Sequence, residues 1–304
     1  MPSTREIRQR IRSVKNTAKI TKAMQMVASS KMRRAQERVE QARPFADQIR
    51  ELVSRLATAA SNGSDDLVED LALLKQRPVR NIGIVLISPD RGLCGALPSN
   101  INRHAALTAR NESQRLSEQG RSPGVEYIAV GRKGRDFVIR NDLGLAAEFT
   151  NYGDRPGLSD ATAIAKVAVD AFLKGEVDVV YLVYAKFVNT VTQTPVTVQL
   201  LPVQPPEKKE EDEQEKKKQA TEYIYEPNEQ TIFKALLPRY VDILVYQAML
   251  EAVASQQSAQ MVAMKNATDN ANELIQDLTL TYNKVRQAAI TTQILEVVAG
   301  AEAL

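Results

Sequence analysis

The sequence has almost no cysteine or histidine, which narrows the chemistry it can support. Its 304 residues include one cysteine, Cys94, and one histidine, His104. A single cysteine excludes an internal disulfide framework and a cysteine-based metal cluster, which fits a reducing compartment. A zinc site or a Cys–His catalytic pair would need both residues together. We therefore favour packing or surface roles for the two side chains.

Tryptophan is absent and long apolar runs are missing, which limits both the core and any membrane contact. Aromatic residues make up only 5% of the chain, so small and aliphatic side chains must do most of the packing. No run approaches the roughly 18 apolar residues of a membrane-spanning helix. The first residues lack the apolar core of an export signal. We expect no export, and membrane association only through partners or surface charge.

The sequence also lacks the glycine-rich motifs that hold nucleotides. Neither Gly-x-x-x-x-Gly-Lys-Ser/Thr nor Gly-x-Gly-x-x-Gly occurs. The turn at 90–95 (DRGLCG) follows an expected strand and precedes an expected helix, where α/β proteins place ligands, but it resembles a phosphate loop only loosely. Nothing in this turn would activate Cys94 as a nucleophile. We predict no catalytic residue, no cofactor and no metal in this chain.

A long helical pattern is present at the amino terminus. Ser3 and Glu6 form a Ser-x-x-Glu capping box, which predicts a helix start, and the run SNGS at 61–64 predicts its end. A heptad pattern covers about 80 Å of helix between them. Its members are Ile7, Ile11, Val14, Ala18, Thr21, Gln25, Ala28, Met32, Ala35, Val39, Ala42, Ala46, Ile49, Val53, Leu56 and Ala60. Pro44 predicts either a bend or two helices that meet at Arg43.

The carboxyl end repeats this architecture. From Glu229 onward there is no glycine before Gly300 and no proline after Pro238, so the pattern predicts one helix of about 100 Å. Two columns at sevenfold spacing form its seam: Ile243, Leu250, Gln257, Met264, Ala271, Leu278, Val285 and Thr292, with Ala254, Met261, Thr268, Ile275, Tyr282 and Ala289. The two helices predict an antiparallel coiled coil made by one chain. Its Ala-, Thr- and Gln-rich seam fits either plain close packing or a slim rod that slides past another protein.

The segment between the two helices predicts a small Rossmann-like α/β domain with a mostly parallel sheet. Strands are expected at 79–88, 125–130 and 177–187, helices around 105–109 and 162–172, and a hairpin edge at 190–203. The stretch at 205–218 (PPEKKEEDEQEKKK) has no apolar side chain and predicts a solvated excursion.

The fold class is therefore α/β, with a long antiparallel coiled coil of the terminal helices beside a small domain. We expect four parts: an amino-terminal coiled-coil helix at 1–60, an α/β domain at 61–204, a charged linker at 205–222 and a carboxyl-terminal coiled-coil helix at 223–304.

The first 34 residues are strongly basic. Only Glu6 opposes ten cations, which are Arg5, Arg8, Arg10, Arg12, Lys15, Lys19, Lys22, Lys31, Arg33 and Arg34. Nucleic acid or anionic lipid would fit such a helix. No aromatic residue interleaves the cations for base stacking, and a basic collar that meets acidic protein loops fits equally well.

Six stretches resemble, in order along nearly the whole chain, the gamma subunit of rotary F-type ATP synthases. They are 20–31 (ITKAMQMVASSK), 88–95 (SPDRGLCG), 225–227 (YEP), 236–238 (LLP), 261–271 (MVAMKNATDNA) and 282–291 (YNKVRQAAIT). The chain departs from the family at 255–260 (SQQSAQ), where a Glu-His pair and an arginine are usual, and at Gln293, where glutamate is common.

The resemblance implies a non-catalytic rotor shaft. In the family the coiled coil enters a hexamer of alpha and beta subunits. A membrane c-ring, driven by ion flow, turns the foot of the shaft together with the epsilon subunit, and the turning shaft drives ATP synthesis in the head or is driven by hydrolysis. The implied place is the cytoplasmic face of a bacterial plasma membrane, without a span of its own and without nucleic acid.

The resemblance also implies contact residues. Lys22, Met24 and Gln25 on the first helix, with Arg286, Gln287 and Thr291 on the last, would touch the head. Tyr223, Tyr225 and Glu226 would meet the ring and the epsilon subunit at the foot. Two other classes stay open from the residues alone: a nucleic-acid-binding protein with a coiled-coil arm, and a small α/β enzyme with helical extensions.

Overall fold

The structure is a computed structural model that describes residues 3–62, 72–118, 120, 123–204 and 229–302. The chain divides into two compact units, one made of 1–30 with 260–304 and the other of 31–259. The first long helix, α1 (Thr4–Asn62), and the last, α7 (Glu229–Glu302), each contribute to both units. The division into four parts that the sequence suggested, at 1–60, 61–204, 205–222 and 223–304, stays a prediction.

The first unit is an antiparallel pair of helices. The hydroxyls of Thr21 and Thr268 lie 2.7 Å apart in the buried seam, and Arg8 Nη2 donates to the Tyr282 hydroxyl at 2.5 Å. These contacts lie thirteen residues apart on α1 and fourteen on α7, so the two helices run in opposite directions with one steady register. Side chains buried in this seam are Ile7, Ala18, Thr21, Ala28, Met264, Thr268 and Ala271. The predicted coiled coil is confirmed.

The predicted start of α1 is also confirmed. The backbone amide of Glu6 donates to Ser3 Oγ at 3.2 Å, and the amide of Ser3 donates to Glu6 Oε2 at 3.1 Å. This reciprocal pair satisfies amides that a helix start leaves free. Pro44 lies inside the single helix α1, so the alternative of two helices that meet at Arg43 is wrong.

The second unit is built on a five-stranded sheet with the order β3-β2-β1-β4-β5. Its strands are β1 (Asn81–Ile87), β2 (Gly124–Val130), β3 (Gly144–Phe149), β4 (Val179–Phe187) and β5 (Gln193–Leu201). The pairs from β3 to β4 are parallel, whereas β5 returns antiparallel to β4. The mostly parallel sheet and the hairpin edge are confirmed. Strand β3 was not predicted.

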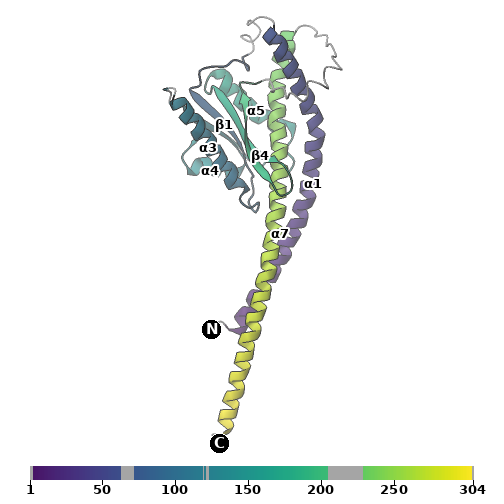
Figure 1. The fold of residues 1–304 in the computed structure, drawn as a ribbon, viewed down its shortest axis with the longest axis vertical. Helices are drawn as coiled ribbons and strands as arrows, with labels where there is room; N and C mark the ends of the chain where they lie inside the picture. The colour runs from purple at the N-terminus through teal and green to yellow at the C-terminus, as the bar shows by residue number, and fades with distance from the viewer. Residues whose placement is uncertain (1–2, 63–71, 119, 121–122, 205–228, 303–304) are drawn as a thin grey trace. The chain divides into compact units, whose positions relative to one another are not determined.

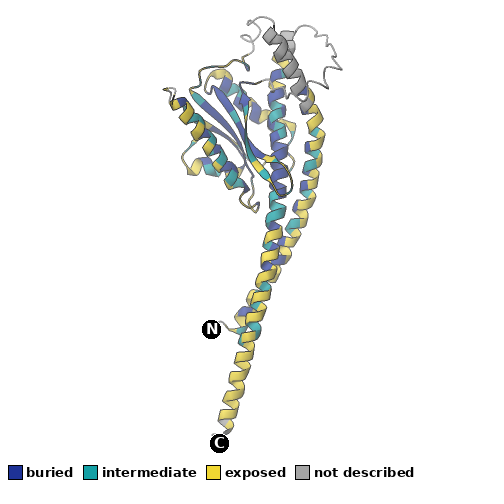
Figure 2. Cartoon of the chain, viewed as in Figure 1, coloured by how far each residue is buried: buried dark blue, intermediate teal, exposed yellow. Residues whose placement is uncertain are grey.

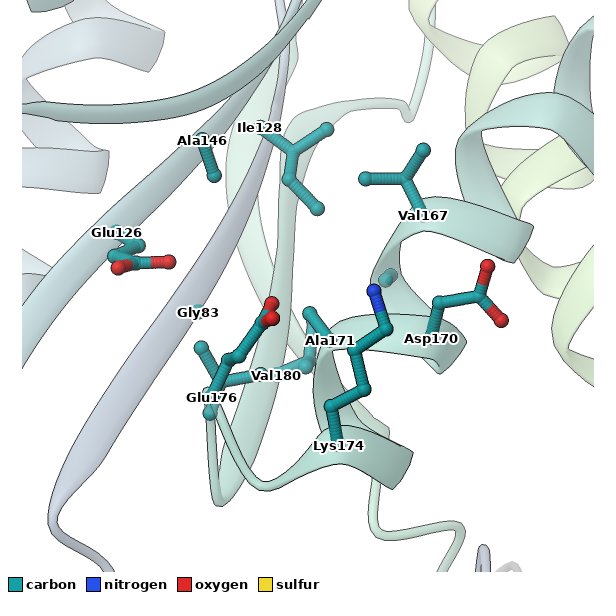
Figure 3. Close-up of a pocket in the computed structure, with 12 residues that line it drawn as sticks. Gly83, Glu126, Ile128, Ala146, Val167, Asp170, Ala171, Lys174, Glu176 and Val180 are labelled. Atoms are coloured by element: carbon teal, nitrogen blue, oxygen red, sulfur yellow. The ribbon is translucent and has the colours of Figure 1, made fainter.

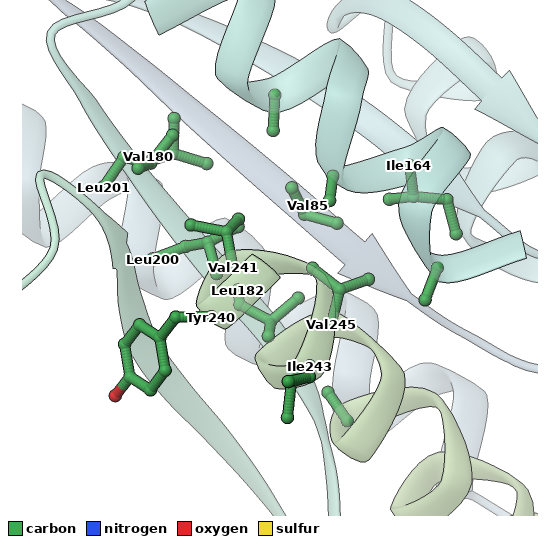
Figure 4. Packing of buried hydrophobic residues seen from close by; sticks show 14 of the residues in the cluster. Val85, Ile164, Val180, Leu182, Leu200, Leu201, Tyr240, Val241, Ile243 and Val245 are labelled. Carbon is green, nitrogen blue, oxygen red and sulfur yellow. The ribbon is translucent and has the colours of Figure 1, made fainter. Parts of the chain in front are cut away.

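Helices cover both faces of this sheet (Figure 1). On one face α3 (Leu97–Ser117) and α4 (Arg132–Arg140) close a core with residues such as Ile84 and Ile101. On the other face α5 (Leu158–Lys174) and part of α7 pack against the sheet, and Figure 4 shows Val241 and Val245 of α7 beside strand residues. Each fully buried aliphatic side chain contributes about 1.5–3 kcal/mol, so α7 is part of the domain core.

The seam of the long helices continues within this unit. Ala35 and Val39 of α1 pack against Leu250, Val253 and Ala254 of α7. The charged stretch at 205–222 and the seam side chains of Val53, Leu56 and Ala60 lie outside the described residues.

Glu251 of α7 is a carboxyl group buried beside the sheet, with 5% of its surface exposed. Gln247 Nε2 donates to its Oε1 at 3.3 Å, whereas Oε2 has no hydrogen-bond partner in the described part of the chain. Burial raises the pKa of Glu251. Hydrogen bonds from Gln247 and Tyr184 and the charges of Lys186 and Arg43 lower it, but they offset the effect of burial only in part. The folded state therefore binds this proton more tightly than the unfolded chain does.

Glu251→Gln is expected to stabilise the protein only where the carboxyl is charged. Because the folded pKa is raised, the stability linked to this group is fully present below about pH 4 and is lost as the pH rises through the folded pKa. Urea unfolding at pH 8 should show a gain on the order of 1 kcal/mol, and at pH 4 no change. Glu273→Gln, at an exposed position of α7, is the control. An equal gain at both pH values would contradict the assignment.

Candidate functional site

The first group of predicted contact residues lies on α1 beside the seam. Lys22 is exposed and its Nζ donates to Gln25 Oε1 at 3.4 Å, while Met24 and Gln25 are half-buried. Exposed apolar side chains flank this group: Ile20, Met26 and Val27. Because these three side chains gain nothing from the seam, this face of α1 suits contact with another protein.

The second group lies on α7, where Arg286, Gln287 and Thr291 are all exposed. The guanidinium carbon of Arg286 lies 5.9 Å from the centroid of the Tyr282 ring, and that of Arg8 lies 5.4 Å from it. The Thr291 hydroxyl donates to the carbonyl of Gln287 at 3.0 Å, within its own helix. The side chain of Gln287 and the outer edge of Arg286 are accessible to a partner.

The two groups form two surfaces rather than one site. Thr21, beside the first group, pairs with Thr268. Arg286 follows Thr268 by 18 residues, which is about 27 Å along a helix. Tyr223, Tyr225 and Glu226, predicted for the foot, lie outside the described residues, so their role stays a prediction.

Beyond Val285 the helix α7 is exposed at every described position up to 299 (Figure 2). Ala289 and Thr292 were predicted for the seam, and this prediction was wrong. The register places the start of α1 near residue 286 of α7, so no described part of α1 lies opposite these residues. The exposed tip carries five large apolar side chains: Ile290, Ile294, Leu295, Val297 and Val298. An apolar surface of this kind marks an interaction site. Sequence reasoning missed it, although the start of α1 at the capping box was a usable signal.

The two helices of the first unit also differ in charge. The exposed cations of α1 in this unit are Arg5, Arg8, Arg10, Arg12, Lys15, Lys19 and Lys22. On α7 the exposed carboxylates Asp269, Glu273 and Asp277 recur every four residues and share one face. The rod therefore presents a basic helix and an acidic stripe to its surroundings.

Helix α4 begins where many α/β proteins bind phosphate, but its first amides already have partners. All three partners lie in the segment that follows β1. The amide of Arg132 donates to Asp90 Oδ1 at 3.0 Å, and that of Lys133 to the Pro89 carbonyl at 3.1 Å. The amide of Gly134 donates to Ser88 Oγ at 2.6 Å. The carboxylate of Asp90 thus takes the place of a bound anion at this helix start.

Cys94 and His104 have separate structural roles. Cys94 is 2% exposed, and burial raises the pKa of its thiol. A backbone hydrogen bond and the charge of Lys133 lower this pKa, but their effects are weaker than that of burial. His104 Nε2 lies 3.1 Å from the Thr197 hydroxyl, on β5. The described residues contain no group of three His, Cys, Asp or Glu side chains that could hold a metal ion. None of their helices is apolar enough over 18 residues to cross a membrane.

A slot of about 200 Å³ lies between α5 and the sheet (Figure 3). Its apolar lining includes Gly83, Ile128, Val167 and Val180. Its charged residues are Glu126, Asp170, Lys174 and Glu176. No serine, cysteine or histidine lines the slot.

An antiparallel coiled coil of the two terminal helices, with an α/β domain inserted between them in sequence, is the fold of a rotor stalk. The central stalk of the mitochondrial ATP synthase of Tetrahymena thermophila, solved with its c-ring, matches with a TM-score of 0.55 at 28% identity, over 82% of this chain and 99% of that one. A chain of the Euglena gracilis enzyme, at 20% identity, shows the same fold with a TM-score of 0.64 over 99% of this chain and 94% of that one.

The sequence comparisons identify the family within this class. The family model described as ATP synthase matches residues 3–304. The ATP synthase gamma chain of Roseiflexus castenholzii is 47% identical over 305 residues, which cover 100% of this chain and 99% of the relative. That of Dehalococcoides mccartyi is 47% identical over the whole of both chains. The chain belongs to the ATP synthase gamma chain family.

Proposed function

We propose that this chain is the central rotor shaft of an F-type ATP synthase and contains no active site of its own. It couples rotation of an ion-driven membrane ring to ATP synthesis in an alpha/beta head, and runs in reverse on hydrolysis. The observation that carries the proposal is the coiled coil whose last helix continues as an exposed apolar tip. Such a tip is costly in water unless another protein covers it.

The asymmetry of the rod explains how rotation acts on the head. One helix is basic outside the seam and the other bears the acidic stripe of Asp269, Glu273 and Asp277, so each partial turn offers a different charge to a given subunit. A ligand or partner shifts a conformational equilibrium by the difference in its affinity for the two states. A turning rod therefore biases each catalytic subunit in sequence, without any chemistry of its own.

We assign the contacts within this scheme as follows. The alpha and beta subunits form a hexamer around one copy of the chain and meet Lys22, Met24 and Gln25 on α1. Arg286, Gln287 and Thr291 on α7 meet a second level of the head. Tyr223, Tyr225 and Glu226 meet the c-ring and the epsilon subunit. The complex is peripheral to the cytoplasmic face of a bacterial plasma membrane, and the chain itself binds neither cofactor nor metal.

Reconstitution tests this proposal. The chain is purified with alpha and beta subunits of a related F-type enzyme, and complex stoichiometry and ATP hydrolysis are measured. We expect one copy per hexamer and hydrolysis that depends on the chain. A complex that forms equally well without the chain, or salt-sensitive RNA binding by the chain at nanomolar concentration, would contradict the shaft role.

A further inference from the structure

A polar cavity of about 270 Å³ lies where the parallel strands of the sheet end. Its lining comes from the segments after β1, β2 and β3 and from α7, and consists of Asp90, Arg91, Arg132, Asn151, Tyr152, Gly153, Asp154 and Gln256. A water molecule takes up roughly 30 Å³, so the space is large enough for a small ion with its water. Open α/β sheets bind ligands at this edge, outside the carboxyl ends of their strands.

Gln256 is the residue that points to a ligand. It is 92% buried, at 8% exposure, yet it lines the cavity. Within the described part of the chain its amide forms no hydrogen bond or ion pair. The amide atoms of Gln256 are not among the fully buried unpaired polar atoms of the described residues, so they are accessible from the cavity that Gln256 lines. An amide that borders a cavity without a protein partner is placed to bind something in that cavity.

The two carboxylates of the cavity already have partners. Asp90 Oδ1 accepts the backbone amide of Arg132 at 3.0 Å. Asp154 Oδ2 accepts Lys31 Nζ at 2.6 Å, and its Oδ1 accepts Gln257 Nε2 at 2.8 Å. The charge of Asp154 is therefore balanced by a lysine, and the acceptor of Asp90 is used by the start of α4.

The two guanidiniums of the cavity are not balanced in the same way. The Arg132 side chain donates Nη2 to the Asn151 side-chain oxygen, which is neutral. Arg91 has no ion pair or hydrogen bond from its guanidinium among the described residues. Because the charges of Asp154 and Lys31 cancel, the charges left around the cavity are those of Arg91, Arg132 and Asp90, which sum to one positive charge. Guanidiniums bind carboxylate and phosphate oxygens through two parallel hydrogen bonds.

We propose that this cavity binds a small free oxyanion, either phosphate or a carboxylate. Arg91 and Arg132 pair with its oxygens, and the amide nitrogen of Gln256 donates to it from the α7 side. The ion would link the strand ends to α7 and so join the α/β domain to the long helix. This site is additional to the shaft role. Binding of the ion to the isolated full-length chain does not depend on whether the chain acts as a rotor shaft.

Calorimetric titration of the full-length chain tests the site, with inorganic phosphate in one arm and citrate in another at constant ionic strength. We expect saturable binding of one ion per chain in at least one arm. Gln256→Glu should weaken that binding by about tenfold or more, because it places a carboxylate among the guanidiniums and removes the amide donor. Arg132→Gln should weaken it to a similar extent while it keeps the backbone bond to Asp90.

Gln276→Glu is the matched control, since it makes the same charge change at an exposed position of α7 that does not line the cavity. It should leave the affinity unchanged, and all variants should keep the wild-type melting temperature in the absence of the ion within a few degrees. An ATP arm without magnesium separates a free ion from a nucleotide phosphate. Absence of saturable binding in both ion arms, binding of ATP alone, or equal affinity in the wild type and Gln256→Glu would overturn the proposal.

Discussion

Gly131→Ala is expected to prevent the α/β domain from folding. Gly131 has a φ of +96°, and a Cβ atom there would lie 1.9 Å from the carbonyl oxygen of Ser88. Neither backbone can move away easily, because the amide of Ser88 donates to Val130 at 2.8 Å and that of Gly131 donates to Phe149 at 2.7 Å. We expect a loss of more than about 4 kcal/mol. Hydrogen exchange should show that the amides of β1 and β2 lose their protection.

Gly153→Ala separates the clash from the backbone strain. Gly153 also has a positive φ, +69°, but no atom lies within 4 Å of the position its Cβ would take. Its replacement should cost only the strain of a left-handed backbone at alanine, about 1–2 kcal/mol. The amides of the sheet should keep their protection from hydrogen exchange. If both alanine variants lost the same stability, the close approach of Gly131 to Ser88 would not be what requires glycine.

Joint replacement of Arg286 and Gln287 by alanine is expected to lower ATP hydrolysis of the reconstituted complex by about tenfold, the effect of losing one or two hydrogen bonds to a charged partner. Both side chains are exposed in the chain itself. The described contact of the Arg286 guanidinium is the Tyr282 ring, 5.9 Å away. The isolated variant should therefore melt within a few degrees of the wild type, so that the loss reports contact with the head.

Lys284→Ala is the control for this pair. Lys284 is an exposed cation on the same stretch of α7, and no contact with the head is assigned to it. Its removal should leave hydrolysis within about twofold, because an exposed charge contributes little by itself. An equal loss in Lys284→Ala would show that the overall charge of this stretch, rather than Arg286 and Gln287, governs the effect.

The long helices were predictable because their signals are local and periodic. The capping box at Ser3 and Glu6 and the sevenfold spacing of the seam depend only on residues near each other in sequence. Even so, the end of the seam could not be read from α7 alone. Ala289 and Thr292 follow the pattern but are exposed, because a seam needs a partner and α1 begins at Thr4.

Strand β3 shows the opposite case, an element with almost no local signal. Its sequence GLAAEF has a glycine, two alanines and a glutamate, which are poor strand formers. The strand forms because β2 offers a parallel edge, with Glu126 opposite Gly144 and Val130 opposite Phe149. Pairing across the sheet outweighs local preference here, and no window of the sequence contains that information.

The same reason explains which sites were visible in the sequence. Met24 and Arg286 lie in contiguous family motifs, so they could be named before the fold was known. The polar cavity draws on four separate segments, and Gln256 looked like one polar residue in a glutamine-rich stretch. Only the fold brings it to Arg91 and Arg132.

Rotation of the shaft is tested most directly by observing it. Cys94 is buried, so Leu107→Cys, at a half-exposed position of α3, provides an accessible thiol on the α/β domain for a visible probe. The complex with alpha and beta subunits is fixed to a surface through beta, and ATP is added. The shaft role predicts that the probe turns continuously in one direction and stops when ATP is removed. A probe that only fluctuates while the same complexes hydrolyse ATP at a normal rate would contradict it.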